Sequence, residues 1–440
     1  MNVENVEIKQ LMQETGVAFG TSGARGLANE MTDRVCYAYT KGFLQYLESI
    51  GELNTPGSEV AIAGDLRPST GRIMAAVAKA AEDMGYAPVN CGRIPSPGVA
   101  LYGINHSCPA IMVTGSHIPA DRNGIKFNKA SGEVLKSDEA GITSQVVELE
   151  DMNFDSDGAF SEPVELPVEN GAAAEAYVKR YLDAFPADCL SGKKIGIYQH
   201  SAVGRELLVE LFTGLGAEVV PLGWSDTFVP VDTEAIRKED IALARQWTGE
   251  HGFDAVLSTD GDSDRPLISD ENGECLRGDI AGILVASYLG ADSVSTPVSS
   301  NTALEKCGRF EEILRTRIGS PFVIASMMEA AEAGRSGIVG YEANGGFLTN
   351  SRFKLFGNTL AALPTRDAVL PVLCIILLSV KEGKPISELV SNLPQRFTLS
   401  DRIQDFPTTE SAKILQQFEK APAIESVFGD ALGKVASIDR

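Results

Sequence analysis

A chain of 440 residues exceeds what one hydrophobic core usually organises, because a domain takes roughly 150 residues. Hydrophobic residues make up 44% of the chain, which is enough for substantial cores and excludes both a disordered protein and a single small binding module. The formal net charge of −22 repels nucleic acids and anionic membrane surfaces, so we expect no nucleic-acid and no membrane partner.

The chain carries no clear targeting or disulfide signal. Its longest apolar run, 369–380, is interrupted by Pro371 and is shorter than the roughly 20 residues that cross a bilayer. The first ten residues contain acids and no apolar core, so they do not form a secretory signal and we expect a cytoplasmic protein. Seven cysteines form no C-x-x-C pair, which favours reduced thiols over disulfides or a zinc site.

The first third of the chain alternates strand-like and helix-like stretches, which is typical of an α/β domain. We expect a buried strand at 58–65, followed by a helix that Ser69 and Thr70 cap. A second apolar strand at 110–114 leads into the turn Gly115-Ser116-His117-Ile118-Pro119. Loops after strands commonly carry the chemistry of such folds.

An acidic stretch with two prolines, 151–170, indicates a linker into a second α/β unit. In this unit we expect strands and helices in alternation, at 194–198, 202–215, 218–222, 236–250 and 255–258. The last strand opens onto Asp260-Gly261-Asp262-Ser263-Asp264-Arg265, and a hairpin with Asn272–Gly273 in its turn follows.

A third unit begins near residue 278. Its strand at 338–342 ends in the polar loop Glu342-Ala343-Asn344-Gly345-Gly346. The last strongly apolar helix is expected at 368–380, and 381–394 is expected to be a connection.

The aspartates of the second unit are the strongest chemical signal. Asp260, Asp262 and Asp264 place three carboxylates at alternate positions after an apolar strand, and such charges repel one another unless a cation lies among them. The pattern predicts a site for a hard divalent metal, with a solvated acidic turn as the alternative. An EF-hand is disfavoured, because Arg265 stands where that loop requires glycine and the flanking segments are strand-like and not helical. Arg265 could instead bind a phosphate that the metal also contacts, or form a plain ion pair.

Three further segments offer catalytic groups. Ser116 lies in an exposed bend that can present its hydroxyl to a ligand, although it could be an ordinary turn serine. His117 is a candidate base for it, but adjacent residues seldom point at each other. Lys126 follows a tight turn and could act as a base near cations and a metal. Around Arg25, glycines and hydroxyls suit an anion, with a plain turn as the alternative.

These motifs, in this order, resemble those of the α-D-phosphohexomutase family, which includes phosphomannomutase/phosphoglucomutase and phosphoglucosamine mutase. Thr21-Ser22-Gly23-Ala24-Arg25-Gly26 matches TSGxRG, Thr114 to Pro119 resembles the phosphoserine loop TASHNP, and Asn123 to Lys126 matches NGxK. Asp260 to Arg265 resembles the metal loop DGDGDR, and Glu342 to Gly346 resembles the sugar-recognition loop ExSGH.

The resemblance implies an enzyme that interconverts hexose 1-phosphate and hexose 6-phosphate. A phosphoserine would give its phosphoryl group to the sugar, and the resulting hexose 1,6-bisphosphate would return the other one. The implied cofactors are Mg²⁺ and this bisphosphate, the implied partner is a small phosphosugar, and we expect a monomer or homodimer. The implied site residues are, as catalytic groups, Ser116, Lys126, Arg25 and His117; for substrate, Arg265, Glu342, Asn344 and Gly319; and for metal, Asp260, Asp262, Asp264 and Ser116.

Two departures from the family pattern leave the substrate open. Asn344 and Gly346 occupy the Ser and His positions of the sugar loop. A phosphomannomutase or a dual phosphomannomutase/phosphoglucomutase is our first choice, and a phosphoglucosamine mutase is the second. Two other classes stay open: a Mg²⁺-dependent phosphatase that uses Ser116, and a non-catalytic sugar-phosphate sensor.

The resemblance also implies the overall architecture. We expect three successive α/β domains with mixed sheets around a central cleft, at 1–160, 161–277 and 278–392. A smaller α+β C-terminal domain would begin at 393 and would carry a phosphate-binding loop of the type RxSGTEPxxR. Nothing after Pro394 matches that loop, so we expect a truncated domain over 393–440, without much of its sheet and without its phosphate clamp.

Overall fold

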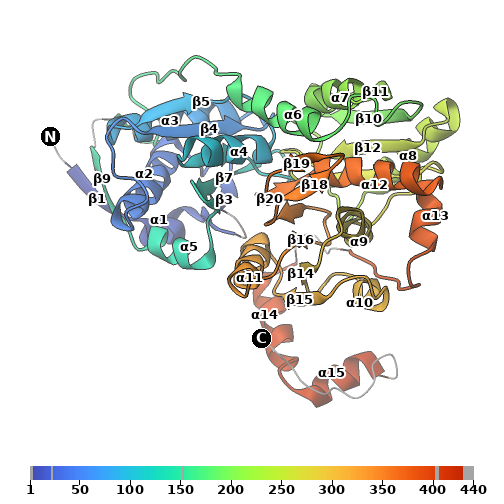
Figure 1. Ribbon diagram of the computed structural model, residues 1–440. Helices are drawn as coiled ribbons and strands as arrows, with labels where there is room; N and C mark the ends of the chain where they lie inside the picture. Colours follow the sequence, from blue (N-terminus) through green and yellow to red (C-terminus); the bar gives the residue numbers. More distant parts are fainter. Residues whose placement is uncertain (1–2, 21–22, 151–152, 402–405, 430–440) are drawn as a thin grey trace. The chain divides into compact units, whose positions relative to one another are not determined.

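Three mixed β-sheets with helices packed on their faces make up the chain as far as Thr398 (Figure 1). The computed structural model describes residues 3–20, 23–150, 153–401 and 406–429. It separates into two units, Met1–Thr398 and Leu399–Arg440. None of the helices in the described residues is long and apolar enough to cross a membrane.

The first sheet has the strand order β2-β3-β7-β6-β4-β5, with β8 paired to β7. Strands β5, β4 and β6 are parallel, and β7 runs antiparallel to both β6 and β3. Its strands are β2 (Ala18–Phe19), β3 (Ala24–Leu27), β4 (Glu59–Gly64), β5 (Ala87–Asn90), β6 (Ala110–Val113), β7 (Arg122–Lys129) and β8 (Gly132–Glu133). The accompanying helices are α1 (Ile8–Thr15), α2 (Asp33–Ser49), α3 (Thr70–Asp83), α4 (Ser96–His106) and α5 (Lys136–Thr143), and β1 (Val3–Glu7) pairs with β9 (Val146–Glu150).

Both faces of this sheet are covered, which explains why its central strands are continuous apolar runs. In β4, Val60 and Ile62 belong to a core cluster that includes residues of α2 and α3. Ala61 and Ala63 point the other way, into a separate cluster that includes residues of α4. Alternate side chains of one strand therefore supply two cores.

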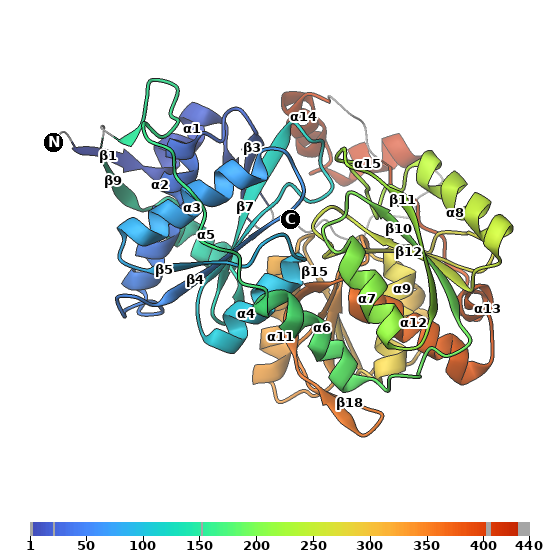
Figure 2. The same cartoon turned by 90° about the horizontal axis from the view of Figure 1, so that it is seen from above.

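The second and third sheets share one core. The second sheet has the order β11-β10-β12-β13 and the third β15-β14-β16-β17-β20. A single hydrophobic cluster contains Ile195 and Leu257 of the second sheet, Tyr341 and Phe347 of the third, and Leu373 of α12. Figure 2 shows helices α9 and α12 beside the strands of the second sheet. The strands are β10 (Lys194–His200), β11 (Glu218–Trp224), β12 (Ala255–Thr259), β13 (Pro266–Ser269), β14 (Ser293–Pro297), β15 (Glu312–Thr316), β16 (Ile338–Tyr341), β17 (Phe347–Thr349) and β20 (Leu363–Asp367), with a hairpin of β18 (Phe353–Leu355) and β19 (Asn358–Leu360). The helices are α6 (Ala172–Ala184), α7 (Arg205–Gly214), α8 (Lys238–His251), α9 (Gly278–Leu289), α10 (Ala303–Lys306), α11 (Ser320–Glu332), α12 (Val369–Glu382) and α13 (Ile386–Ser391).

The α/β architecture with mixed sheets is confirmed, and two local expectations are wrong. Ser69 does not cap α3 with its side chain; its hydroxyl accepts a hydrogen bond from Asn123 Nδ2 at 2.9 Å instead. The stretch expected as a connection, 381–394, contains the short helix α13. Ile386 and Leu389 of this helix are buried, and these two apolar residues at helical spacing are the signal that the sequence offered.

Two helices, α14 (Thr408–Gln417) and α15 (Ala421–Phe428), lie in the second unit, and its described residues contain no strand. The apolar residues Ile414, Leu415 and Phe418 do fall on a helix or at its end, as their spacing predicts. The domain boundaries and an incomplete C-terminal domain stay predictions.

Candidate active site

Ser116 lies in the loop between β6 and β7, at the end of a fully buried strand. Its backbone has a φ of +56°, a left-handed conformation that costs a residue other than glycine about 1–2 kcal/mol. The expectation of an exposed bend is wrong, because the side chain of Ser116 is buried beneath the acidic loop's carboxylates. Its Oγ donates a hydrogen bond to Asp260 Oδ2 at 2.6 Å. A strained, buried serine aimed at a carboxylate from another sheet is typical of a functional position rather than of an ordinary turn.

The acidic loop follows β12 and brings its three aspartates together. Carboxylate oxygens of Asp260, Asp262 and Asp264 all lie within 4.8 Å of one another, and all three residues are buried. Two of their oxygens, Oδ1 of Asp262 and Oδ1 of Asp264, accept no hydrogen bond from any described residue. Buried carboxylate oxygens without donors fit a hard cation, which bonds to oxygen ligands of this kind.

A glycine lets this loop approach the serine loop. A Cβ atom at Gly261 would stand 2.6 Å from the carbonyl oxygen of Ser116, so no larger residue fits without displacing one loop. Ser263 stands where the family motif has glycine, and its φ is +55°. The Ser263 hydroxyl accepts a hydrogen bond from the backbone N–H of Gly204 at 3.0 Å, which offsets part of the cost of that conformation.

Cationic side chains surround the aspartates. Lys126 Nζ donates to Asp262 Oδ2 at 2.5 Å and to Asp264 Oδ2 at 2.7 Å. Arg265 Nε lies 3.6 Å from Asp264 Oδ1, and Arg25 on β3 is half-buried. Burial, followed by the charges of Arg265 and Arg366, lowers the pKa of Arg25 to about 10, so its guanidinium stays charged at neutral pH and can bind an anion.

Burial alone would raise the pKa of all three carboxyls, and their charged neighbours decide the direction that results. Burial and then the charges of the other two aspartates raise the pKa of Asp260 well above its usual value. Burial would also raise the pKa of Asp264, but the charges of Arg366 and Lys126 outweigh it and lower that pKa. The cationic neighbours of Asp264 therefore hold this carboxyl in its charged form.

His117 is neutral and bound to an arginine. Burial, then the charge of Arg265, lowers the pKa of His117 to about 3. Its Nδ1 lies 2.8 Å from Arg265 Nη1 and 3.3 Å from Ser116 Oγ. Because Arg265 donates to Nδ1, that nitrogen has no lone pair left for a proton from Ser116 in this arrangement.

The polar loop after β16 is held by its own backbone. Glu342 N donates to Gly346 O at 3.1 Å, and Asn344 Oδ1 accepts from Gly346 N at 3.0 Å. The side-chain oxygen of Asn344 thus stabilises the loop, while the two N–H groups of its side-chain amide can still donate to a ligand. The Glu342 carboxylate is bound through Oε2 to Arg366 Nη1 at 3.3 Å.

Two residues of the TSGxRG segment, Thr21 and Ser22, lie outside the described residues. Gly319 is buried, has a φ of +125° and precedes α11. The next residue, Ser320, donates to Glu133 Oε2 at 2.7 Å, which places the start of α11 against β8 of the first sheet. The loops of all three sheets that were singled out in the sequence therefore meet, with Gly319 at their border.

Comparison with known proteins identifies the family. The descriptions "Phosphoglucomutase/phosphomannomutase, alpha/beta/alpha domain" I, II and III match residues 16–152, 175–273 and 277–397. A phosphomannomutase of Salmonella muenchen is 44% identical over 406 residues, or 92% of this chain and 81% of its own. A phosphomannomutase of Sinorhizobium fredii is 41% identical over 424 residues, which cover 96% of this chain and 88% of that protein. This chain belongs to the phosphoglucomutase/phosphomannomutase family.

The fold agrees with a solved structure of a member of this family from Burkholderia thailandensis. The TM-score is 0.68 over 87% of this chain and 80% of that chain, at 20% sequence identity. As a member of the phosphoglucomutase/phosphomannomutase family, the protein is a phosphohexomutase, an intramolecular phosphotransferase that acts on a sugar phosphate.

Sequence reasoning missed the residue that supports the serine loop of this phosphohexomutase. Arg67 is buried, and its Nη2 donates to the carbonyl oxygens of Ser116 at 2.8 Å and Ile118 at 2.6 Å. Its Nη1 donates to the carbonyl oxygens of Pro119 and Arg122, and its Nε to Asp65 Oδ2 at 3.1 Å. All five guanidinium donors are thus used. The sequence signal that could have indicated this role is the pair Asp65 and Arg67, directly after a buried strand.

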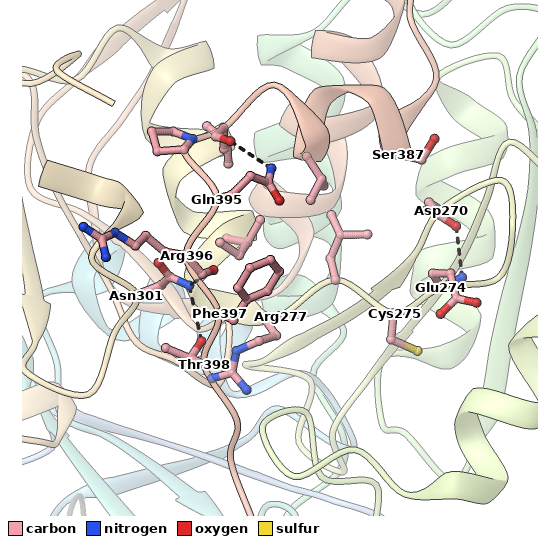
Figure 3. Close-up of a pocket in the computed structure, with 15 residues that line it drawn as sticks. Asp270, Glu274, Cys275, Arg277, Asn301, Ser387, Gln395, Arg396, Phe397 and Thr398 are labelled. Carbon is pink, nitrogen blue, oxygen red and sulfur yellow. Dashed lines mark hydrogen bonds between the residues drawn. The ribbon is translucent and has the colours of Figure 1, made fainter. Parts of the chain in front are cut away.

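A cavity lies away from these residues. It has a volume of about 280 Å³ and lies between the turn after β13, the start of α9 and residues 393–398 (Figure 3). Phe397 extends across it, and Asn301 Nδ2 ties this segment down by donating to Arg396 O at 2.9 Å. None of the predicted site residues lines it.

Proposed function

We propose that this phosphohexomutase interconverts mannose 1-phosphate and mannose 6-phosphate through a phosphoserine at Ser116. One observation carries the proposal: Ser116 Oγ donates to Asp260 Oδ2 at 2.6 Å, where the serine loop of the first sheet meets the acidic loop of the second. Two relatives that are 41–44% identical and bear the name phosphomannomutase favour mannose over other hexoses.

Mg²⁺ fits the acidic loop. The carboxylates of Asp260, Asp262 and Asp264 would hold it, together with an oxygen of the phosphorylated Ser116, because their oxygens lie within reach of one ion and two of them lack donors. When bound, the ion would neutralise negative charge on the phosphoryl group.

The chain's own residues would carry out the transfer. The bond between phosphorus and Ser116 Oγ breaks while a bond to the free sugar hydroxyl forms. Lys126 accepts the proton of that hydroxyl once its ammonium, which binds Asp262 and Asp264, has given a proton to solvent. The bisphosphate then turns round, its other phosphoryl group bonds to Ser116 Oγ, and the proton returns to the sugar oxygen that is left. Arg25 would bind the phosphoryl oxygens, since its half-buried guanidinium is charged and donates no hydrogen bond to a described residue.

Four residues would hold the rest of the substrate. Glu342 and Asn344 offer a carboxylate oxygen and two amide donors to the sugar hydroxyls. Arg265, held by His117 and the aspartates, would bind the phosphate. Gly319 would contribute backbone groups at the start of α11.

The test is ³¹P NMR of the purified protein with Mg²⁺, a trace of mannose 1,6-bisphosphate and mannose 1-phosphate. The 6-phosphate should appear, and Ser116→Ala should abolish it. Glucose 1-phosphate and glucosamine 1-phosphate in parallel samples establish the preferred sugar. Inorganic phosphate without the 6-phosphate would indicate a phosphatase, and no turnover of any sugar phosphate would indicate a binding protein.

A further inference from the structure

Among the described residues, Arg366 on β20 is the largest fully buried side chain, with 1% of its surface exposed. Its Nε donates to Asp264 Oδ2 at 3.1 Å, and its Nη1 donates to Glu342 Oε2 at 3.3 Å. One guanidinium therefore joins the acidic loop to the sugar loop. The planar fork of arginine carries its donors on three nitrogen atoms and so reaches both loops, whereas a lysine ammonium carries all of its donors on one nitrogen.

Arg366 packs against Gly346, the residue of the sugar loop that stands where the family has histidine. A Cβ atom at Gly346 would stand 2.6 Å from Cδ and 2.7 Å from Cγ of Arg366. The stem of Arg366 thus fills the space that a side chain at position 346 would need. Where the family's sugar loop ends in histidine, this chain ends in glycine and places an arginine from a neighbouring strand over it.

The strand that carries Arg366 is fixed on both sides. Thr365 Oγ1 donates to Glu133 Oε1 at 2.7 Å, which ties β20 to the first sheet. Asp367 accepts a hydrogen bond from the hydroxyl of Tyr177 at 2.7 Å and another from Tyr181, both on α6. Arg366 consequently has little freedom to follow a moving loop, so the loops must adjust to it.

We propose that Arg366 is a positioning residue for sugar recognition, an inference that rests on the proposed function. By binding Oε2 of Glu342, it leaves Oε1, to which no described residue donates, directed by a fixed carboxylate plane toward sugar hydroxyls. Its charge beside Asp264 also opposes the binding of a cation there. Arg366 therefore strengthens the binding of sugar and weakens that of Mg²⁺.

Calorimetric titration of two Arg366 variants separates charge from geometry. Arg366→Met keeps an apolar stem but removes the fork and the charge, so mannose 1-phosphate should bind at least tenfold more weakly and Mg²⁺ severalfold more tightly. Arg366→Lys keeps the charge, so Mg²⁺ affinity should stay near that of the wild type while the sugar phosphate is still weakened. The matched control is Arg335→Met, an exposed arginine paired with Glu312, which should change neither constant.

A role in folding alone would weaken both ligands together, so opposite changes in Arg366→Met are the decisive result. Unchanged affinity for mannose 1-phosphate, or parallel losses of both ligands in Arg366→Met and Arg366→Lys, would overturn the proposal. Failure of the proposed function looks different: the wild type would then bind the sugar phosphate without isomerising it. If Arg366→Met proves unstable, Arg366→Lys still tests the proposal: weaker binding of mannose 1-phosphate at wild-type Mg²⁺ affinity supports it, and wild-type affinity for both ligands overturns it.

Discussion

Arg67 determines the shape of the serine loop through contacts with four backbone carbonyl groups and one carboxylate. Each hydrogen bond from a charged donor is worth about 1.5–3 kcal/mol, and a carbonyl left without a donor in a buried place adds its own cost. The left-handed conformation of Ser116 persists because these contacts define it. The guanidinium of Arg67 also lies 4.0 Å from the ring centre of Phe228, so an aromatic contact adds to its hydrogen bonds.

We expect Arg67→Lys to lower kcat by about a hundredfold or more and the free energy of unfolding by about 3 kcal/mol, since a buried charge loses most of its partners. Turnover by NMR and urea unfolding measure the two effects. Arg335→Lys, at an exposed ion pair, is the control and should lie within 0.5 kcal/mol of the wild type, roughly the usual range for surface changes. A wild-type kcat in Arg67→Lys would show that turnover does not depend on the hydrogen bonds between Arg67 and the serine loop.

At the scale of elements, the loops after β6 and β12 approach each other so closely that a Cβ atom at Gly261 would stand 2.6 Å from the carbonyl oxygen of Ser116. We expect Gly261→Ala to push the acidic loop away from Ser116 and to reduce turnover by at least tenfold, because a displacement of about 1 Å can cost a hundredfold in rate. Gly249→Ala on α8, whose new methyl group meets open space, is the matched control. Equal activity of the two variants would contradict the close approach.

A buried histidine at the end of β10 makes stability depend on pH. Burial lowers the pKa of His200 to about 4, while an unfolded histidine titrates near 6.5. Between pH 6.5 and about 4, His200 therefore binds a proton in the unfolded chain but not in the folded chain. The stability that is present above pH 6.5 is lost as the pH falls toward 4.

This loss amounts to about 1.4 kcal/mol per pH unit between those values. We expect urea unfolding of His200→Asn to show a shallower decline between pH 6.5 and 4.5 than the wild type. Asparagine is chosen because the φ of residue 200 is +28°, and asparagine tolerates positive φ. The exposed His251→Asn serves as control, and identical slopes in all three proteins would remove His200 as the cause.

The sequence predicted those elements whose signals are local. Strands such as 110–114 and the acidic loop after 255–258 were found because apolar runs and alternating carboxylates are visible in a few residues. The roles of Arg67 and Arg366 were missed, since both depend on partners distant in the chain: Arg366 reaches back to Asp264 and Arg67 forward to Ile118. The helix at 386–391 was missed because only two apolar residues mark it.

At the scale of the whole molecule, the site unites loops that belong to three sheets, so ligands should stabilise the entire folded unit. Binding of Mg²⁺ to the native state alone raises stability by about 2.7 kcal/mol at a hundredfold excess over Kd. We expect Mg²⁺ to raise Tm and a chelator to reverse the shift. Asp262→Asn, which keeps the shape but removes one charge, should reduce the shift, and an equal shift in that variant would exclude the acidic loop as the site.

The central claim is that Ser116 carries the transferred phosphoryl group, and intact mass spectrometry tests it most directly. The protein is incubated with Mg²⁺ and mannose 1,6-bisphosphate, freed of small molecules and weighed beside Ser116→Ala treated in the same way. The account predicts a gain of one phosphoryl group in the wild type and its absence in Ser116→Ala. After addition of mannose 1-phosphate it predicts that mannose 6-phosphate forms while Ser116 stays phosphorylated, because the bisphosphate returns a phosphoryl group to it. An unmodified wild type, or an equal gain in both proteins, would contradict it.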